Sequence, residues 1–155
     1  MPYRLGRMSH HYPTMTPHLG VRDGAAALDF YARAFGAKEE ARFQTADGTV
    51  IHAEIRLDDA LVTLGMAMPD FDLAEPDPDQ PVHVTLTWFT DDVDAAYARA
   101  VEAGCRSVSE PTDQFHGDRT CALRDPFGHR WVIATHLRDV PLDEQQAAFH
   151  QMMDG

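Results

Sequence analysis

Tyr31-Ala32-Arg33-Ala34 returns as Tyr97-Ala98-Arg99-Ala100, less than half a chain length later in a sequence of 155 residues. Each copy lies in a helix-like stretch, which follows a short apolar strand pattern that ends in acidic residues. A glycine, Gly36 or Gly104, follows each stretch, and strand-like segments come after it. Because self-similarity at a fixed offset marks a duplicated structural unit, the sequence predicts two βαβββ modules.

The elements of each module follow from hydrophobic spacing and turn residues. The spacing predicts helices over Ala25–Phe35 and Val93–Ala103, which begin after the N-cap residues Asp23 and Asp92. A terminal helix is expected over Pro141–Met153. The expected strands are Thr14–Arg22, Glu40–Thr45, Thr49–Leu57, Ala60–Met66, Val82–Phe89, Arg106–Glu110, Asp118–Arg124 and Arg130–Thr135.

These elements predict an α+β fold in which two tandem βαβββ modules form a cupped mixed sheet around a cavity. One domain is expected over residues 14–140, after a flexible N-terminal tail, residues 1–13, and before a C-terminal helix, residues 141–155. The parts of this domain are module one (14–68), an acidic, proline-rich linker (69–81) and module two (82–138).

The bulk composition excludes several classes of partner. A formal net charge of −12 argues against nucleic acid and against an anionic membrane, since both require a basic surface. The charge would suit a cationic ligand, although solubility alone also explains it. Cys105 and Cys121 are the two cysteines, and we expect them to be buried and reduced in a cytoplasmic protein. No apolar run is long enough to span a membrane.

Strand alternation predicts where a site lies. Ile51, Ala53, Ile55 and Leu57 face one way, whereas His52, Glu54 and Arg56 face the other. In the second module, His83 and Thr85 likewise oppose a set of apolar residues. So many polar side chains do not suit a dry core, and we therefore expect them to line a partly wet cavity.

Several segments of this sequence together resemble one known family. The most specific is Asp125-Pro126-Phe127-Gly128-His129-Arg130-Trp131-Val132-Ile133-Ala134-Thr135-His136. Further segments are Thr16-Pro17-His18-Leu19-Gly20-Val21-Arg22-Asp23, Ile51-His52-Ala53-Glu54 and Asp113-Gln114-Phe115-His116-Gly117-Asp118-Arg119. They resemble the vicinal oxygen chelate superfamily, which includes glyoxalases, bleomycin-resistance proteins and extradiol dioxygenases, and within it the PhnB-like branch.

The resemblance implies paired βαβββ modules, commonly in a homodimer, and a divalent metal in the enzymes of the family. Carried onto this chain, the family's metal-ligand positions hold Thr16, Thr63, His83 and Val132. Only His83 is a ligand type, so the usual metal site is dismantled and no cofactor is expected. A relocated divalent metal site built from His18, His83 and Glu54 is the alternative.

The sequence thus leaves two functions open. The first is a metal-free binder of a small molecule, resembling bleomycin-resistance proteins. The second is a glyoxalase- or dioxygenase-like enzyme with the relocated metal, or a metal-free lyase or isomerase in which His52 and Glu54 are the catalytic acid and base. The residues predicted to bind a ligand are His18, His83, Thr85, Phe115, His116, Arg119 and Trp131.

Overall fold

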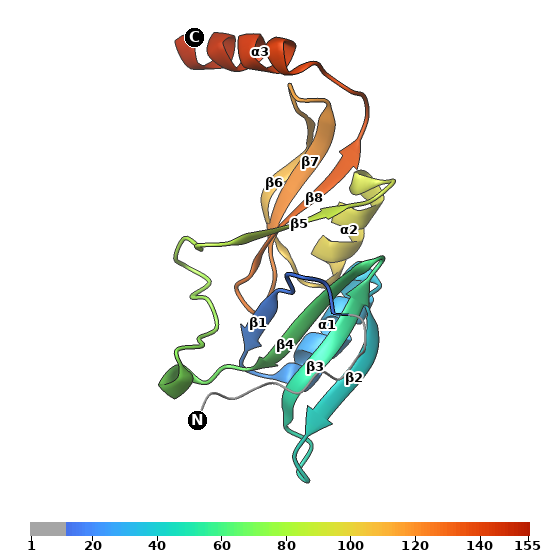
Figure 1. Ribbon diagram of the computed structural model, residues 1–155, viewed down its shortest axis with the longest axis vertical. Coiled ribbons are helices and arrows are strands. Elements are labelled where there is room, and N and C mark those ends of the chain that lie inside the picture. The colour runs from blue at the N-terminus through green and yellow to red at the C-terminus, as the bar shows by residue number, and fades with distance from the viewer. Residues whose placement is uncertain (1–11) are drawn as a thin grey trace. The chain divides into compact units, whose positions relative to one another are not determined.

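The computed structural model describes residues 12–155, and its contacts divide into two compact units, one that ends at Pro76 and one that begins at Asp77. Each unit contains one four-stranded mixed sheet with one helix on a single face (Figure 1). The predicted duplication of a βαβββ module is therefore confirmed. Residues 1–11, most of the predicted tail, lie outside the described residues.

The first unit has the strand order β1-β4-β3-β2, in which β1 runs parallel to β4 and the other neighbours are antiparallel. Its apolar face meets α1 and contributes Val21, Ala53, Ile55 and Leu64 to the core. The elements of this unit are β1 (His18–Val21), α1 (Gly24–Phe35), β2 (Lys38–Gln44), β3 (Val50–Leu57), β4 (Ala60–Met66) and a short 3-10 helix (Pro69–Phe71).

The second unit repeats this topology in the order β5-β8-β7-β6, with β5 parallel to β8. Its elements are β5 (Thr85–Phe89), α2 (Val93–Ala103), β6 (Arg106–Asp113), β7 (Asp118–Arg124), β8 (Arg130–His136) and α3 (Leu142–Asp154). Both cysteines are free and buried, as predicted, and burial raises the pKa of the Cys105 thiol to about 12.

The same local chemistry starts and ends the helix of each module. The carboxylate of Asp23 accepts a hydrogen bond from the Ala26 N–H at 3.0 Å, and that of Asp92 accepts one from the Ala95 N–H at the same distance. These bonds satisfy N–H groups that have no partner within the helix. Gly36 then ends α1 in the left-handed region at φ 69°, which glycine adopts without strain.

The turn between β7 and β8 is held by one buried carboxylate. One oxygen of Asp125 accepts hydrogen bonds from the backbone N–H groups of Phe127 and His129, at 2.9 and 3.0 Å. The other oxygen accepts the Trp131 indole N–H at 2.9 Å, and Trp131 is only 2% exposed. Trp131, predicted to bind a ligand, is therefore a core residue whose polar atom is already engaged.

The structure shortens two predicted strands. β1 begins at His18 rather than Thr14, and β5 begins at Thr85 rather than Val82. Pro17 lies directly before the new start of β1, and proline lacks the N–H that a ladder requires. His83 lies exposed outside β5, and strand alternation does not assign it to a face.

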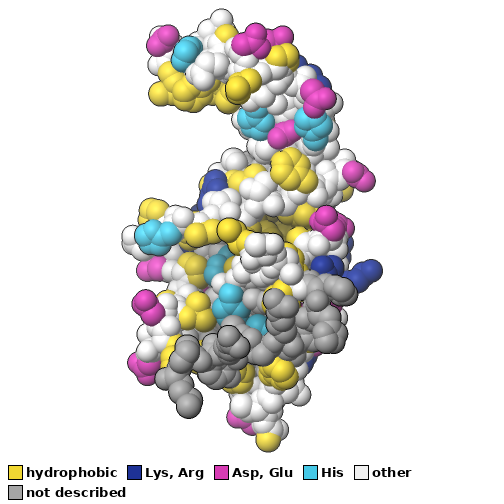
Figure 2. Space-filling view, in the orientation of Figure 1, with side chains coloured by type: hydrophobic (Ala, Val, Ile, Leu, Met, Phe, Trp, Pro, Cys, Tyr) yellow, Lys and Arg dark blue, Asp and Glu magenta, His cyan; other side chains and the backbone are white. Residues whose placement is uncertain are grey.

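The C-terminal helix α3 has no buried residue. Figure 2 shows hydrophobic side chains gathered along one side of this helix, at the top of the view. Leu142, Phe149, Met152 and Met153 are the exposed large apolar residues of α3. The predicted homodimer stays a prediction. None of the helices between residues 12 and 155 combines the length and the apolar character that crossing a membrane requires.

We expect Asp23→Ala to lower the free energy of unfolding by about 1 kcal/mol, because it removes the side-chain acceptor for the Ala26 N–H. Urea denaturation followed by circular dichroism measures this difference. Asp23→Asn is the matched control, since asparagine caps helices about as well as aspartate. Equal losses in the two variants would contradict the assigned cap.

Candidate functional site

The face of the first sheet that α1 does not cover carries a cluster of polar side chains. The register places His18 of β1 opposite Thr63 of β4, and Thr63 opposite Glu54 of β3. His52 lies two residues before Glu54 and therefore on the same face, opposite Phe43 of β2. The prediction that His52 and Glu54 share one face is confirmed, and His18 lies on the same face, with its ring against that of His52.

The hydrogen bonds of Thr63 fix which tautomer the His18 ring adopts. The Thr63 hydroxyl donates to the Pro17 carbonyl at 3.0 Å, and His18 Nδ1 lies 2.8 Å from the same hydroxyl oxygen. A hydroxyl has one proton, so His18 Nδ1–H is the donor of the second bond. Burial, and then the nearby His52, lower the pKa of His18. The ring is thus neutral near pH 7, and its Nε2 is a hydrogen-bond acceptor.

His52 is the least satisfied polar side chain of this face. It is 3% exposed, and neither ring nitrogen has a hydrogen-bond partner within residues 12–155. Its ring lies nearly parallel to that of His18, with 5.5 Å between the centroids and 8° between the planes. Desolvation lowers the pKa of His52, and the charge of Glu54 opposes this shift only in part. Two neutral, parallel imidazoles therefore lie side by side.

Glu54 is fully buried beside them, at 0% exposure. Its Oε1 accepts a hydrogen bond from the Tyr12 hydroxyl, while Oε2 has no partner among the described residues. An unpaired buried carboxylate oxygen is costly and favours a ligand that brings a donor. Tyr12 falls in the segment predicted to be a flexible tail, yet its hydroxyl contacts the site.

Gly65 allows the His18 ring to lie flat on the sheet. A Cβ atom at this position would lie 3.3 Å from Cε1 and Nε2 of His18 and 2.5 Å from the Ile51 carbonyl oxygen. Any larger residue would therefore displace the ring or the neighbouring strand. The absence of a side chain here is part of the site's geometry.

Above this face lies a cavity of about 330 Å³. Such a volume lies at the lower end of the range for small-molecule pockets. The Phe43 ring lies 6.3 Å from the His52 ring and adds an aromatic surface beside the imidazoles. The residues that line the cavity are Tyr12, Pro13, Thr14, Thr16, His18, His52 and Thr63.

Thr85, Phe115 and His116, three further predicted ligand residues, lie in the second unit and have partners there. The Thr85 hydroxyl accepts a hydrogen bond from Arg130, and Phe115 contacts the ring of Phe149 in α3 at 6.1 Å. His116 lies 3.3 Å from Asp118. These contacts occupy the side chains with interactions inside their own unit.

Arg119 is another residue of the second unit that the sequence predicts to bind a ligand. It is instead bound to Asp94 and Asp113, both at 2.8 Å. These two carboxylates raise the pKa of Arg119 far above its usual range. Its charge is therefore neutralised by two surface aspartates.

The residues at the family's metal positions do not fit a divalent ion. Thr63 stands where the resemblance places a carboxylate, and its hydroxyl is already engaged by His18 and Pro17. Across residues 12–155, no three His, Cys, Asp or Glu side chains come together as ligands. Of the alternative ligands, His18 and Glu54 belong to the first unit and His83 to the second.

Comparison with known proteins gives the same family as the fold. The family model for the glyoxalase/bleomycin resistance protein/dioxygenase superfamily matches residues 10–133. An uncharacterized protein of Mycobacterium bovis is 39% identical over 146 residues, which cover 92% of this chain and 96% of that protein. An uncharacterized protein of Mycobacterium tuberculosis has the same identity over 86% of its own length.

Two solved structures have a similar fold. TioX from Micromonospora sp. ML1 is 26% identical with a TM-score of 0.64, and the match covers 81% of this chain and all of TioX, 100%. A glyoxalase/bleomycin resistance protein/dioxygenase family enzyme from Burkholderia phytofirmans is 20% identical with a TM-score of 0.64, over 79% and 97% of the two chains. This chain therefore belongs to the glyoxalase/bleomycin resistance protein/dioxygenase superfamily.

Proposed function

We propose that this protein is a small-molecule binder of PhnB-like type, which takes its ligand in the cavity of the first unit without a metal. The observation that carries the proposal is that buried His52, which lines this cavity, and Glu54, which lies on the same sheet face, keep two ring nitrogens and one carboxylate oxygen without a partner among residues 12–155. Because buried polar groups are normally hydrogen-bonded, unpaired ones beside a cavity indicate where a ligand's polar atoms bind.

The chemistry of these groups selects a class of ligand. Two neutral imidazoles and a carboxylate offer acceptors, so the ligand supplies N–H or O–H donors. The flat surfaces of Phe43 and His52 favour a planar ring system. Glu54 favours a positive charge, and the net charge of −12 acts in the same direction at long range. A flat, donor-rich organic cation combines these properties.

Glu54→Gln keeps an acceptor for Tyr12 but removes the negative charge. We expect it to weaken the binding of proflavine, a flat acridine cation with amino donors, by about tenfold, as for the loss of one charge-assisted hydrogen bond. Fluorescence titration measures the dissociation constant.

The matched control is Glu102→Gln, which makes the same change at an exposed position of α2. It should leave the affinity for proflavine unaltered. Equal weakening in both variants, or equally tight binding of the anion naphthalene-2-sulfonate by the unmodified protein, would refute the proposed ligand class.

The histidines give the fold a specific pH dependence. Both have pKa values below the usual 6.5, so the folded protein binds fewer protons than the unfolded chain in mildly acidic solution. Their contribution to stability is full above pH 6.5 and is lost as the pH falls below it. The slope is at most about 1.4 kcal/mol per pH unit for each histidine, and less for half-buried His18.

Urea denaturation at pH 7.5 and pH 5.5 measures this dependence, and the double variant His18→Asn/His52→Asn should show a smaller loss of stability than the unmodified protein. His136, whose pKa Asp118 and then Asp139 raise, contributes with the opposite sign and cancels in the comparison. His150→Asn, on exposed α3, is the control. A double variant as acid-sensitive as this control would contradict neutral imidazoles.

An enzyme is the second candidate, because neutral His18 carries a basic Nε2 and because His52 and Glu54 could exchange a proton with a bound substrate. Elemental analysis of protein purified without a histidine tag separates a metal enzyme from the proposal. After dialysis against Zn²⁺, Mn²⁺, Fe²⁺, Ni²⁺ or Mg²⁺, we expect no stoichiometric ion. Close to one ion per chain, lost in His18→Ala or His83→Ala, would overturn the metal-free proposal.

A further inference from the structure

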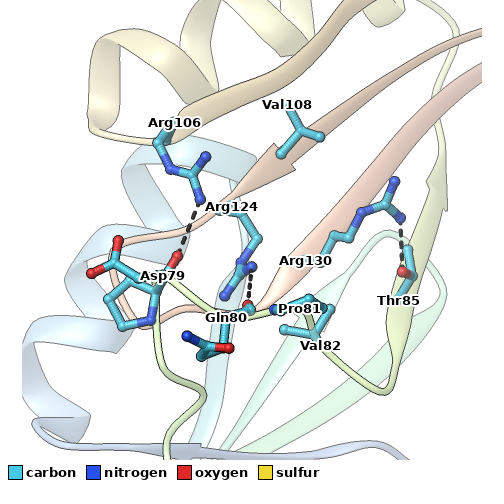
Figure 3. A pocket seen from close by; sticks show the side chains of 10 residues that line it. Asp79, Gln80, Pro81, Val82, Thr85, Arg106, Val108, Arg124 and Arg130 are labelled. Atoms are coloured by element: carbon cyan, nitrogen blue, oxygen red, sulfur yellow. Dashed lines mark hydrogen bonds between the residues drawn. The ribbon is translucent and has the colours of Figure 1, made fainter.

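The second unit carries a different polar surface on its sheet, a row of three arginines and a threonine that crosses all four strands (Figure 3). The register pairs Thr85 of β5 with Arg130 of β8, Arg130 with Arg124 of β7, and Arg124 with Arg106 of β6. Leu123 and Trp131, the neighbours of Arg124 and Arg130 in their strands, point to the opposite face and are buried. We call Arg106, Arg124 and Arg130 the arginine row.

The arginine row breaks a local rule of sheet structure. Like charges directly opposite each other on neighbouring strands destabilise a sheet, and here two successive pairs are both arginine. Nothing in the overall composition requires this arrangement, because the chain has 13 basic and 25 acidic residues. Local conflicts of this kind are typical of functional sites, where a ligand compensates the cost.

Arg124 has a structural role, because each nitrogen of its guanidinium group donates to a backbone carbonyl. It is 7% exposed, and its Nε, Nη1 and Nη2 donate to the carbonyls of Gly128, Gln80 and Asp77 at 2.7, 2.9 and 2.9 Å. The bonds to Gln80 and Asp77 hold the end of the linker against the sheet. Because all three acceptors are uncharged carbonyls, the positive charge of Arg124 is not neutralised by them.

Arg106 and Arg130 keep donors available. Arg106 donates once, from Nη2 to the Pro78 carbonyl at 3.2 Å, and Arg130 once, from Nη1 to the Thr85 hydroxyl at 2.8 Å. Neither forms an ion pair within residues 12–155, unlike Arg119 of the same unit. Their strands lie two spacings apart, about 10 Å, so both long side chains can reach one anion above Arg124.

The row forms one wall of a cavity of about 700 Å³, and the linker from Pro78 to Val82 forms another. Figure 3 shows Pro81 and Val82 on one side of the arginines and Val108 on the other. Val82 and Val108 give this cavity an apolar portion next to the charges. Asp79 is the one acidic residue of the lining, so arginines outnumber carboxylates.

We propose that the arginine row binds a small oxyanion, with its carboxylate or phosphoryl group between Arg106 and Arg130 and an apolar body against Val82 and Val108. Planar guanidinium groups suit both kinds of head group, because they can donate two parallel hydrogen bonds. This site differs from the cavity of the first unit in position and in charge, and it goes beyond the function proposed above.

Isothermal titration calorimetry with phenyl phosphate, benzoate and phenol tests the site on the full chain at low ionic strength. We expect at least one of the two anions to bind at one site per chain, and phenol, which lacks the anionic head group, to bind at least about tenfold more weakly. The anion that binds more tightly identifies the head group. The double variant Arg106→Gln/Arg130→Gln should weaken its binding by more than about tenfold, since each arginine supplies a charge-assisted hydrogen bond.

Arg138→Gln is the matched control, because it removes the same charge from an exposed position of the same unit, outside the cavity lining. It should change the affinity by less than about twofold. Thermal denaturation of each variant verifies that it is folded. Three results would overturn the proposal: neither anion binds, phenol binds as tightly as the anions, or the control weakens binding as much as the double variant.

Discussion

Each four-stranded sheet has one helix to cover it, and this constraint determines where both candidate sites lie. In the first unit α1 buries one face, so the other face is left for His18, His52 and Glu54. In the second unit the same arrangement leaves a face for the arginine row. One topology, used twice, thus carries an acceptor-rich surface in one copy and a cationic surface in the other.

The sequence predicts the elements well, and it predicts side-chain faces well where alternation runs through a complete strand. β3 spans Val50–Leu57, as long as the prediction to within one residue, so the faces of His52 and Glu54 are correct. The assignment of the His83 side chain to a face has no basis, because β5 begins after this residue and side chains alternate between faces only within a strand. Tyr12 was missed because its contact with Glu54 joins residues far apart in sequence, and no local pattern reports such a contact.

The arginine row illustrates a second limit. The Asp125–Gly128 turn fixes the register of β7 and β8, so the pairing of Arg124 with Arg130 could have been counted outward from that turn. Arg106 could not be placed in this way, because β6 pairs with β7 through two register shifts. Bulges depend on packing across the whole sheet, and a single sequence does not specify them.

Gly65 has a consequence for how this cavity differs from others built on the same topology. The position of the His18 ring, which lines the cavity, depends on the absence of a side chain at Gly65, since even one methyl group would meet this ring and the Ile51 carbonyl. A homologous chain with alanine or serine at this position therefore has an imidazole that is tilted or displaced. The side chain at this one position thus sorts such chains by pocket shape, before any ligand is known.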